Sequence, residues 1–201
     1  IILARCPLPS GRLPLLPVRR MLHPLNAQNP ALEAMIVTPL GPVRVFSIHL
    51  AHVGVEERLE QIDFLLAHHA RTGLEGGPWS GTDDEPSRNW TEGQAEPPCP
   101  QTAIWLGDFN CEPGSAEHGR ITGATPYHPG ARYAHGFTDA VAHLGQTVHT
   151  HEKTIAGQRR LRQLDHCFVT GDLVPALRSA CVDNAQIASD HHPLWIEMAA
   201  D

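Results

Sequence analysis

The strongest constraint on the fold is a pair of apolar, β-branched runs around the turn sequence TPLGP, followed at once by a helical pattern. The two runs predict strands near residues 32–38 and 43–50, joined as a hairpin with its turn around Gly41. The segment VEERLEQIDFLLAHHA then places apolar residues on one helical face and predicts an amphipathic helix over roughly residues 55–71. A hairpin followed by such a helix is typical of a sheet that packs against helices.

Four further apolar runs and two short helical patterns extend this arrangement. Strands are predicted for the segments TAIWLG, RQLDHCFVT, ALRSACVDN and PLWIEMA. Short helices are predicted for SAEHGRI, with Ser115 as N-cap, and for FTDAVAHLG, capped by Thr138. Asp139 is interpreted as a structural carboxylate at the N-terminus of the second helix. Strands dominate, so the sequence predicts an α/β fold in which a mixed sheet packs with helices.

Two segments have no regular pattern. Residues 1–30 contain six prolines, which exclude a helix and leave an irregular lead-in with one short strand at Ile1–Ala4. Residues 72–101 combine Gly, Pro, Glu, Asp, Ser and Trp without a period. A loop of this length inside a compact domain is typically functional or disordered. We interpret residues 72–101 as a long loop insertion in a single domain that spans residues 1–201.

Length, charge and cysteine content limit the classes of protein to which the chain can belong. Its 201 residues suffice for one sizeable core, and its net charge of −7 gives no general attraction to a polyanion. A bound divalent cation can still offset carboxylates locally. The five cysteines form no CxxC pair, which argues against a zinc ribbon or a disulfide framework. No stretch is long and apolar enough to cross a membrane.

Polar residues capable of chemistry stand at or just past the ends of four apolar runs: His49, Asp108 with Asn110, Asp165, and Asp190 with His191. A carboxylate in such a place destabilises the fold by several kcal/mol if it is buried without a cation or a donor partner. Four such places in one chain of this size therefore indicate side chains that converge on a common cleft.

This set of side chains fits hydrolysis of a phosphate ester by water. Carboxylates bind Mg²⁺ through oxygen, and the cation offsets charge that builds on the phosphoryl group. A second carboxylate can take the proton from the attacking water, and Asn110 can donate to a phosphate oxygen without adding repulsion. A histidine can polarise the phosphate or transfer a proton, and a partner carboxylate fixes its tautomer.

The segments WLGDFN, RQLDHCFV and SDHHPLW, in this order and after FSIHLAH, resemble the endonuclease/exonuclease/phosphatase superfamily, which has the DNase I-like fold. The resemblance covers about residues 32–199, and the three segments together are far more specific than GDFN alone. It implies two mixed β-sheets packed as a sandwich and flanked by helices. It also implies a divalent-metal-dependent phosphohydrolase that cleaves a phosphodiester or a phosphomonoester.

The resemblance implies a role for each matched residue. Asp108 would orient or deprotonate the attacking water, and Asn110 would hold the scissile phosphate. His191 would contact the phosphate and would be oriented by Asp165. His49 would be the other histidine that flanks the phosphate and could assist the leaving group.

The resemblance also implies a divalent cation, Mg²⁺ or Mn²⁺, with Asp190, Asp108 and Asn110 among its ligands. In the family, a first strand brings an Asn and a later strand brings a Glu that is a main metal ligand, and both precede the matched region. The chain is therefore expected to be an N-terminally truncated domain that lacks the first strands of its sandwich and hydrolyses a generic phosphodiester poorly by itself. Gln163 stands where relatives often carry Arg, two residues before the Asp of the LDH segment.

Each of these residues also has a purely structural interpretation. His49 could be a hydrogen-bonded sheet histidine, and GDFN is good turn chemistry. Asp165 could simply pair with Arg160 or Arg162. His192 is interpreted as a bystander that faces away from its neighbour.

Two other functions are compatible with the sequence. The chain could be a non-catalytic remnant of the fold that binds a phosphate ligand or a partner protein. It could instead be a zinc hydrolase using His68 with His69 or His149 with His151, although the first pair is expected to be solvated because adjacent helical histidines point to different sides. The phosphate-ester substrate could be a nucleic acid, a lipid head group or a small molecule. The acidic charge and scarce aromatics favour the last two slightly.

Overall fold

The central element is a mixed sheet whose described strands lie in the order β1-β2-β3-β4-β8-β5. The computed structural model describes residues 15–21, 31–75, 85, 99–185 and 188–200 of the chain. Strands β3 and β4 are parallel, and the other neighbouring pairs are antiparallel. The strands are β1 (Leu15–Met21), β2 (Ala31–Thr38), β3 (Gly41–His49), β4 (Ala103–Asp108), β5 (Thr138–Asp139) and β8 (Asp165–Val169).

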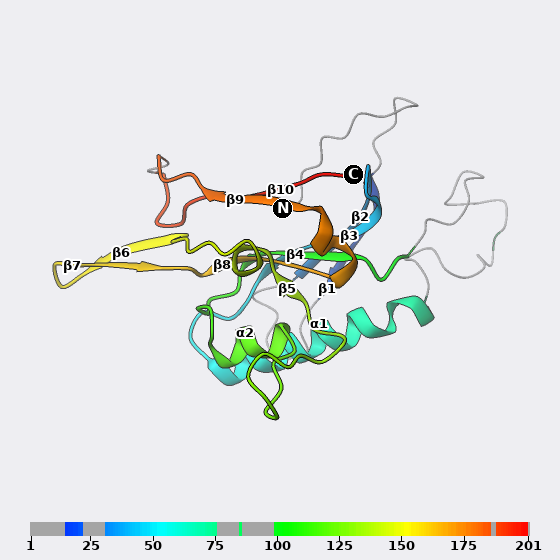
Figure 1. The fold of residues 1–201 in the computed structure, drawn as a ribbon, viewed down its shortest axis with the longest axis horizontal. Coiled ribbons are helices and arrows are strands. Elements are labelled where there is room, and N and C mark those ends of the chain that lie inside the picture. The colour runs from blue at the N-terminus through cyan, green and yellow to red at the C-terminus, as the bar shows by residue number, and fades with distance from the viewer. Residues whose placement is uncertain (1–14, 22–30, 76–84, 86–98, 186–187, 201) are drawn as a thin grey trace.

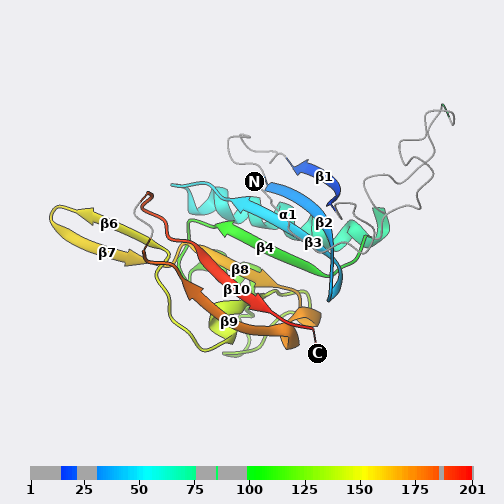
Figure 2. The same cartoon turned by 90° about the horizontal axis from the view of Figure 1, so that it is seen from above.

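Helices lie on one face of this sheet, and an antiparallel pair of strands lies over part of the other face (Figures 1 and 2). Helices α1 (Val55–Glu75) and α2 (Ala116–Ile121) lie on one side. On the other side, β9 (Leu177–Val182) pairs antiparallel with β10 (Leu194–Met198). The expected sandwich of sheets flanked by helices is therefore confirmed, with a second sheet that comprises β9 and β10 among the described residues.

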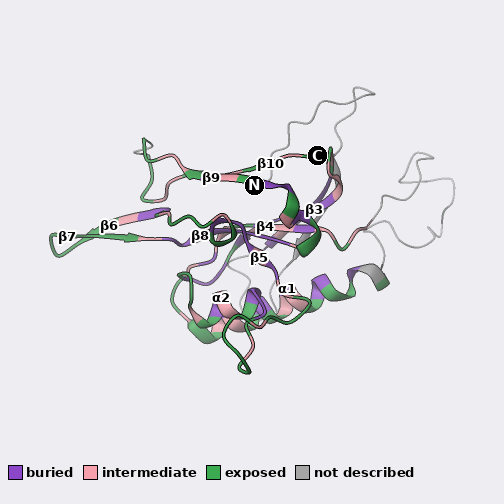
Figure 3. Ribbon diagram, in the orientation of Figure 1, coloured by how far each residue is buried: buried purple, intermediate pink, exposed green. Residues whose placement is uncertain are grey.

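Alternating residues of β3 fill two separate cores. Phe46 and Ile48 belong to a cluster that includes apolar side chains of α1 and α2. Val43 and Val45 belong to a second cluster, which includes side chains of β9 and β10. Because successive side chains of a strand point to opposite faces, the sheet is buried on both sides (Figure 3). This burial fixes the strand ends on which the candidate catalytic residues stand.

Smaller elements connect these layers. The short helix α3 (Ala140–His143) follows β5, and the 3-10 helix η1 (Gly171–Ala176) leads into β9. The hairpin of β6 (His151–Ile155) and β7 (Gln158–Arg162) projects away from the layered body, and most of its residues are exposed (Figures 1 and 3). Within the described part of the chain, no helix combines the length and apolarity needed to cross a membrane.

Most predicted elements are confirmed, including the β2–β3 hairpin, α1, and strands β4, β8, β9 and β10. Ser115 caps α2 as expected. The prediction that Thr138 caps α3 is wrong. The cap is Asp139, whose carboxylate accepts hydrogen bonds from Val141 N and Ala142 N, while Thr138 pairs with β8 as part of β5. The structural role expected of Asp139 at this helix N-terminus is confirmed.

Strand β1 lies inside the proline-rich segment for which the sequence predicts irregular chain. It forms an edge of the sheet, where proline is tolerated because one side of the strand needs no ladder hydrogen bonds. Its register with β2 shifts between Leu15 and Val18, around Pro17. The strand expected at Ile1–Ala4 lies outside the described residues.

The expected loop insertion over residues 72–101 also lies largely outside the described residues. Helix α1 runs through Glu75, so the insertion begins later than the sequence predicts. Its contribution to the domain stays a prediction.

His68 and His69 are not solvated, so that sequence prediction is wrong. Their relative exposures are 8% and 9%. His68 Nε2 lies 3.0 Å from Glu33 Oε2, and Arg44 Nε donates to Glu33 Oε1 at 2.6 Å. Arg44 Nη1 lies 3.2 Å from His69 Nδ1. Both histidines are buried because α1 packs against the sheet over a wide face, which brings them onto the polar side chains of β2 and β3.

The His69 environment predicts acid sensitivity. Burial, and secondarily the charge of Arg44, lowers the pKa of His69 from 6.5 to about 4. Between about pH 6.5 and 4 the folded chain therefore keeps His69 neutral, whereas the unfolded chain binds a proton at this residue. The free energy of unfolding is consequently highest above pH 6.5 and decreases as the pH falls below that value. We expect a loss of up to about 2 kcal/mol of unfolding free energy between about pH 6.5 and 5 from this group.

Urea unfolding of wild type and His69→Gln across this pH range measures the effect. The variant should show a shallower pH dependence. Some dependence should persist, since burial also lowers the pKa of His151. Equal slopes in both proteins would exclude this role for His69.

Candidate active site

Three neighbouring strands bring polar residues to one edge of the sheet. His49 at the end of β3 is in register with Asp108 at the end of β4. Asp108 is in turn in register with Asp165, the first residue of the antiparallel strand β8. The residues are far apart in sequence, but strand pairing places them side by side.

His191 connects two of these carboxylates. Its Nδ1 lies 2.7 Å from Asp165 Oδ2, a hydrogen-bond distance that fits the orienting role which the resemblance implies for Asp165. Its Nε2 lies 3.8 Å from Asp108 Oδ2, and His49 Nε2 lies 3.6 Å from the same oxygen. With Nδ1–H donating to Asp165, the Nε2 atom of His191 is held toward Asp108. The structure therefore brings together His49, Asp108, Asp165 and His191.

The GDFN segment forms a tight turn that fixes Asp108. Asn110 has a positive φ of 50°, and its backbone N donates to Asp108 Oδ1 at 2.8 Å. The Asn110 side-chain Nδ2 donates to Leu50 O at 2.9 Å. Asn110 Oδ1 lies 3.2 Å from His52 Nδ1. The turn chemistry considered for GDFN is thus present, and it also ties Asn110 to the carboxylate and to the segment after β3.

The Asp190 side chain contacts His151 rather than the group of His49, Asp108, Asp165 and His191. Its carboxylate is 57% exposed and lies 3.6 Å from His151 Nε2. Its backbone oxygen accepts a hydrogen bond from Glu152 N, which joins the segment before β10 to the base of β6. No described contact joins Asp190 to Asp108, so a shared metal ion stays a prediction for this pair.

Several supporting residues were missed by sequence reasoning. Thr150 is fully buried, and its Oγ1 accepts hydrogen bonds from the backbone N of Leu164 (3.0 Å) and of Asp165 (2.9 Å). The ring of His151 packs edge-on against His191 at 4.8 Å between centroids. His52 supports Asn110. No sequence pattern marks Thr150, and His151 was considered only as a zinc ligand with His149, because the contacts of both residues depend on how the β6–β7 hairpin joins the sheet.

The contacts of Asp165 and His192 test two structural interpretations from the sequence: that Asp165 pairs with an arginine, and that His192 faces away from His191. The Asp165 carboxylate lies 2.7 Å from His191 Nδ1, whereas Arg162 Nη2 lies 3.4 Å from His151 Nδ1. His192 lines a cavity with Glu152 on the other side of the hairpin, so it faces away from His191 as expected.

Potential metal ligands gather in groups of three at two places in the described part of the chain. One group is Asp108, Asp165 and His191, and the other is His118, Asp139 and His166. The histidine pairs considered as zinc ligands, His68–His69 and His149 with His151, form no such group there.

A family model described as the Endonuclease/Exonuclease/phosphatase family matches residues 40–191. This span includes every candidate site residue and most of the chain. The chain belongs to the endonuclease/exonuclease/phosphatase family. Members of this family are hydrolases that act on phosphate esters, so the resemblance inferred from the sequence is confirmed. A search of curated proteins gave no match.

Solved structures of low sequence identity share the fold of this family member. TDP2 from D. rerio, complexed with a single-strand DNA product, is 15% identical with a TM-score of 0.62, over 95% of this chain and 70% of that chain. The 3' phosphatase NExo from Neisseria, bound to a product DNA hairpin, is 16% identical with a TM-score of 0.59, over 92% and 72%. A functionally unknown conserved protein from Enterococcus faecalis is 17% identical with a TM-score of 0.59, over 93% and 67%.

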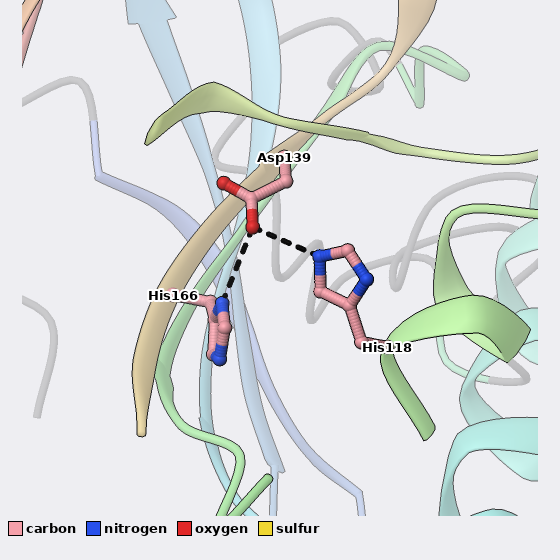
Figure 4. A group of neighbouring side chains, drawn as sticks. All are labelled: His118, Asp139 and His166. Atoms are coloured by element: carbon pink, nitrogen blue, oxygen red, sulfur yellow. Dashed lines mark hydrogen bonds and ion pairs between the residues drawn. The ribbon is translucent and has the colours of Figure 1, made fainter. Parts of the chain in front are cut away.

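A buried hydrogen-bond network of His118, Asp139 and His166 contacts the chain directly after the GDFN segment, at Cys111. His166 Nε2 lies 2.9 Å from Cys111 O, and Asp139 Oδ2 lies 3.3 Å from His166 Nδ1 and 3.0 Å from His118 Nε2 (Figure 4). Burial raises the pKa of Asp139, but hydrogen bonds from His118 and His166 outweigh burial and hold it below its ordinary value. Burial lowers the pKa of His166, but hydrogen bonds to Asp139 and Cys111 raise it overall to about 9.

Proposed function

We propose that this chain carries the catalytic residues of a divalent-metal-dependent phosphoester hydrolase that uses water as the nucleophile. The observation that carries the proposal is the contact of His191 with both Asp165 and Asp108, at 2.7 and 3.8 Å. A histidine held by one carboxylate beside another is suited to proton transfer and to contact with a phosphate. Turnover of a phosphate ester that requires added Mg²⁺ or Mn²⁺ and is lost on replacement of Asp108 tests the proposal.

The donor set fits a divalent cation. Asp108, Asp165 and His191 each offer a ligand atom, and these atoms all lie within 4.8 Å of one another. The side chains of Asp108 and Asp165 are only 18% and 22% exposed, so their mutual repulsion is poorly screened and favours a nearby cation. Carboxylate oxygens are the ligands that Mg²⁺ and Mn²⁺ prefer. Asp108 would hold the ion, with Asp190 and Asn110 as the further oxygen ligands that the family resemblance implies, while Asp165 stays hydrogen-bonded to His191.

When bound, such a cation would polarise the phosphoryl oxygens and offset their developing charge. The side chains supply the remaining functions. Asp165 accepts the Nδ1–H of His191 and thereby fixes the tautomer that presents Nε2 to the phosphate. Asp108 orients the attacking water and accepts its proton. Asn110 uses one N–H to bind Leu50 O and retains a second N–H for a phosphate oxygen. His49 flanks Asp108 and assists the leaving group.

The β6–β7 hairpin favours an extended polyanion as the substrate. In its register His151 pairs with Arg162, and Lys153 pairs with Arg160. Cross-strand partners and alternate residues share a face, so Lys153, Arg160 and Arg162 lie on the same face as His151, which contacts His191. A basic strip therefore leads away from the proposed active site on a chain whose net charge is −7. We infer that this strip binds the phosphates of a nucleic-acid strand, in contrast to the small substrate that composition favours.

The two faces of the hairpin provide a matched test. Arg159, on the opposite face, is paired with Glu152 at 2.7 Å. We expect Arg160→Gln to lower kcat/KM for a single-stranded oligonucleotide about 5-fold and to weaken its salt dependence, because one phosphate contact is lost. The same variant should leave hydrolysis of bis-p-nitrophenyl phosphate unchanged.

Arg159→Gln removes the same charge one residue away and should change neither reaction by more than about 2-fold. Equal effects of the two substitutions on the oligonucleotide would contradict the strip as a binding surface.

A further inference from the structure

We propose that His118, Asp139 and His166 form a second metal site that binds a zinc-class transition-metal ion, separate from the proposed catalytic site. The three side chains come from three elements: α2, the N-cap of α3, and β8 (Figure 4). Asp165 and His166 are consecutive in β8, so their side chains point to opposite faces of the strand. The two metal-ligand groups are therefore distinct.

The distances match a transition-metal site before any ion is added. Asp139 Oδ2 lies 3.0 Å from His118 Nε2 and 3.3 Å from His166 Nδ1, and all three ligand atoms lie within 4.8 Å of one another. Ligand atoms of a tetrahedral zinc ion with bonds of about 2.0 Å are about 3.3 Å apart. The cluster therefore needs only small side-chain movements to surround an ion.

The outer contacts direct one atom of each side chain toward the centre of the cluster. His166 Nε2–H donates to Cys111 O at 2.9 Å, which directs its Nδ1 toward the centre of the cluster. His166 Nδ1 also lies 3.2 Å from Gln163 Nε2, so binding of an ion would replace this contact and release a proton from His166. Asp139 Oδ1 accepts hydrogen bonds from Val141 N (2.9 Å) and Ala142 N (3.2 Å), which leaves Oδ2 facing the two histidines. A histidine that donates its other N–H to a carbonyl, and a carboxylate that is itself hydrogen-bonded, are the usual surroundings of metal ligands.

The three proposed ligands are buried, but a surface cavity reaches two of them. The side chains of His118, Asp139 and His166 are 12%, 3% and 0% exposed. A surface cavity of about 270 Å³ is lined by His118 and Asp139, together with Thr138 and His143. This cavity provides an entry path and space for a water molecule as the fourth ligand.

The ligand types select the ion. Two imidazoles and one carboxylate favour Zn²⁺, Co²⁺ or Ni²⁺ over Mg²⁺, whereas the proposed catalytic site has more oxygen donors. The competing explanation is that Asp139 simply accepts an N–H from each histidine. Similar distances result in both cases, so the experiment must detect the ion itself.

The experiment uses the full-length protein, stripped with a chelator and then loaded with Co²⁺ in the presence of excess Mg²⁺. We expect one equivalent of Co²⁺ to survive gel filtration and to give the visible absorption of a tetrahedral site. His118→Gln should weaken Co²⁺ binding at least about 100-fold. His128→Gln, which makes the same change at an exposed histidine ten positions further along the chain, should leave binding unchanged.

The variant Asp108→Asn/His191→Gln should retain the Co²⁺ spectrum, because it alters only the proposed catalytic group. Its spectrum shows whether Co²⁺ binds outside the proposed catalytic group, even if His118→Gln fails to fold. Absence of retained Co²⁺ in wild type, loss of the spectrum in this double variant, or unchanged binding in folded His118→Gln would each overturn the proposal.

Discussion

The His191→Ala variant of the full-length protein should hydrolyse phosphate esters at least about 100-fold more slowly than wild type, the usual scale for losing one acid–base or electrostatic group. The imidazole of His191 is held by Asp165 at 2.7 Å and lies beside Asp108 at 3.8 Å. Its removal takes away the group that would contact the phosphate. Asp108→Ala should have an effect of at least the same size, since Asp108 would serve both the water and the cation.

His192→Ala is the matched control for His191→Ala. It removes the adjacent imidazole, which lines a cavity on the other side of the β6–β7 hairpin. We expect its rate to stay within about 2-fold of wild type, as for a surface substitution away from the site. The assay compares wild type and the three variants on bis-p-nitrophenyl phosphate and on a short oligonucleotide, with chelator, Mg²⁺ or Mn²⁺.

Two outcomes would change the interpretation. Equal rates in wild type, His191→Ala and Asp108→Ala would exclude the catalytic assignment of these residues. Absence of turnover by wild type with either metal, combined with saturable binding of the oligonucleotide, would favour the non-catalytic alternative.

The backbone elements could largely be predicted from sequence because their signals are local. Helix α1 has a clear helical period, and β3 and β4 are apolar runs. The β6–β7 hairpin lacks such a signal, since its strands are polar and exposed and its turn is Ala156–Gly157 rather than a common turn pair such as Asn-Gly. Its formation depends on attachment to the sheet through Thr150 and His151.

The candidate site follows the same division. Asp108, Asp165 and His191 could be found because each interrupts or follows an apolar run, where a carboxylate or imidazole needs a reason to be present. Thr150 could not, because its role is to accept two backbone hydrogen bonds that exist only in the folded chain. Asp139 was identified as a helix-terminal carboxylate, but its contacts with His118 and His166 join three elements whose relative positions no local pattern specifies.

The close approach of β3 explains why the β4 run ends in a glycine, Gly107, directly before Asp108. Its φ is +138°, a conformation that residues with a side chain rarely adopt, and a Cβ atom there would lie 1.9 Å from Ile48 O. Gly107 is in register with Ile48 across the parallel β3–β4 pair, one position before His49 meets Asp108. A side chain would therefore force apart the two strands that position the site.

Gly107→Ala should accordingly lower the free energy of unfolding by at least about 3 kcal/mol, from the backbone strain and the overlap with β3 together. Gly114→Ala is the control, because Gly114 also has a positive φ (+83°) but a Cβ there meets nothing within 4 Å. Only the backbone term applies at Gly114, and we expect a loss of about 1 kcal/mol. Urea unfolding of both variants measures the difference. Equal losses would mean that β3 and β4 accommodate a methyl group at Gly107, and that close strand contact at this point is not needed to place Asp108 beside His49.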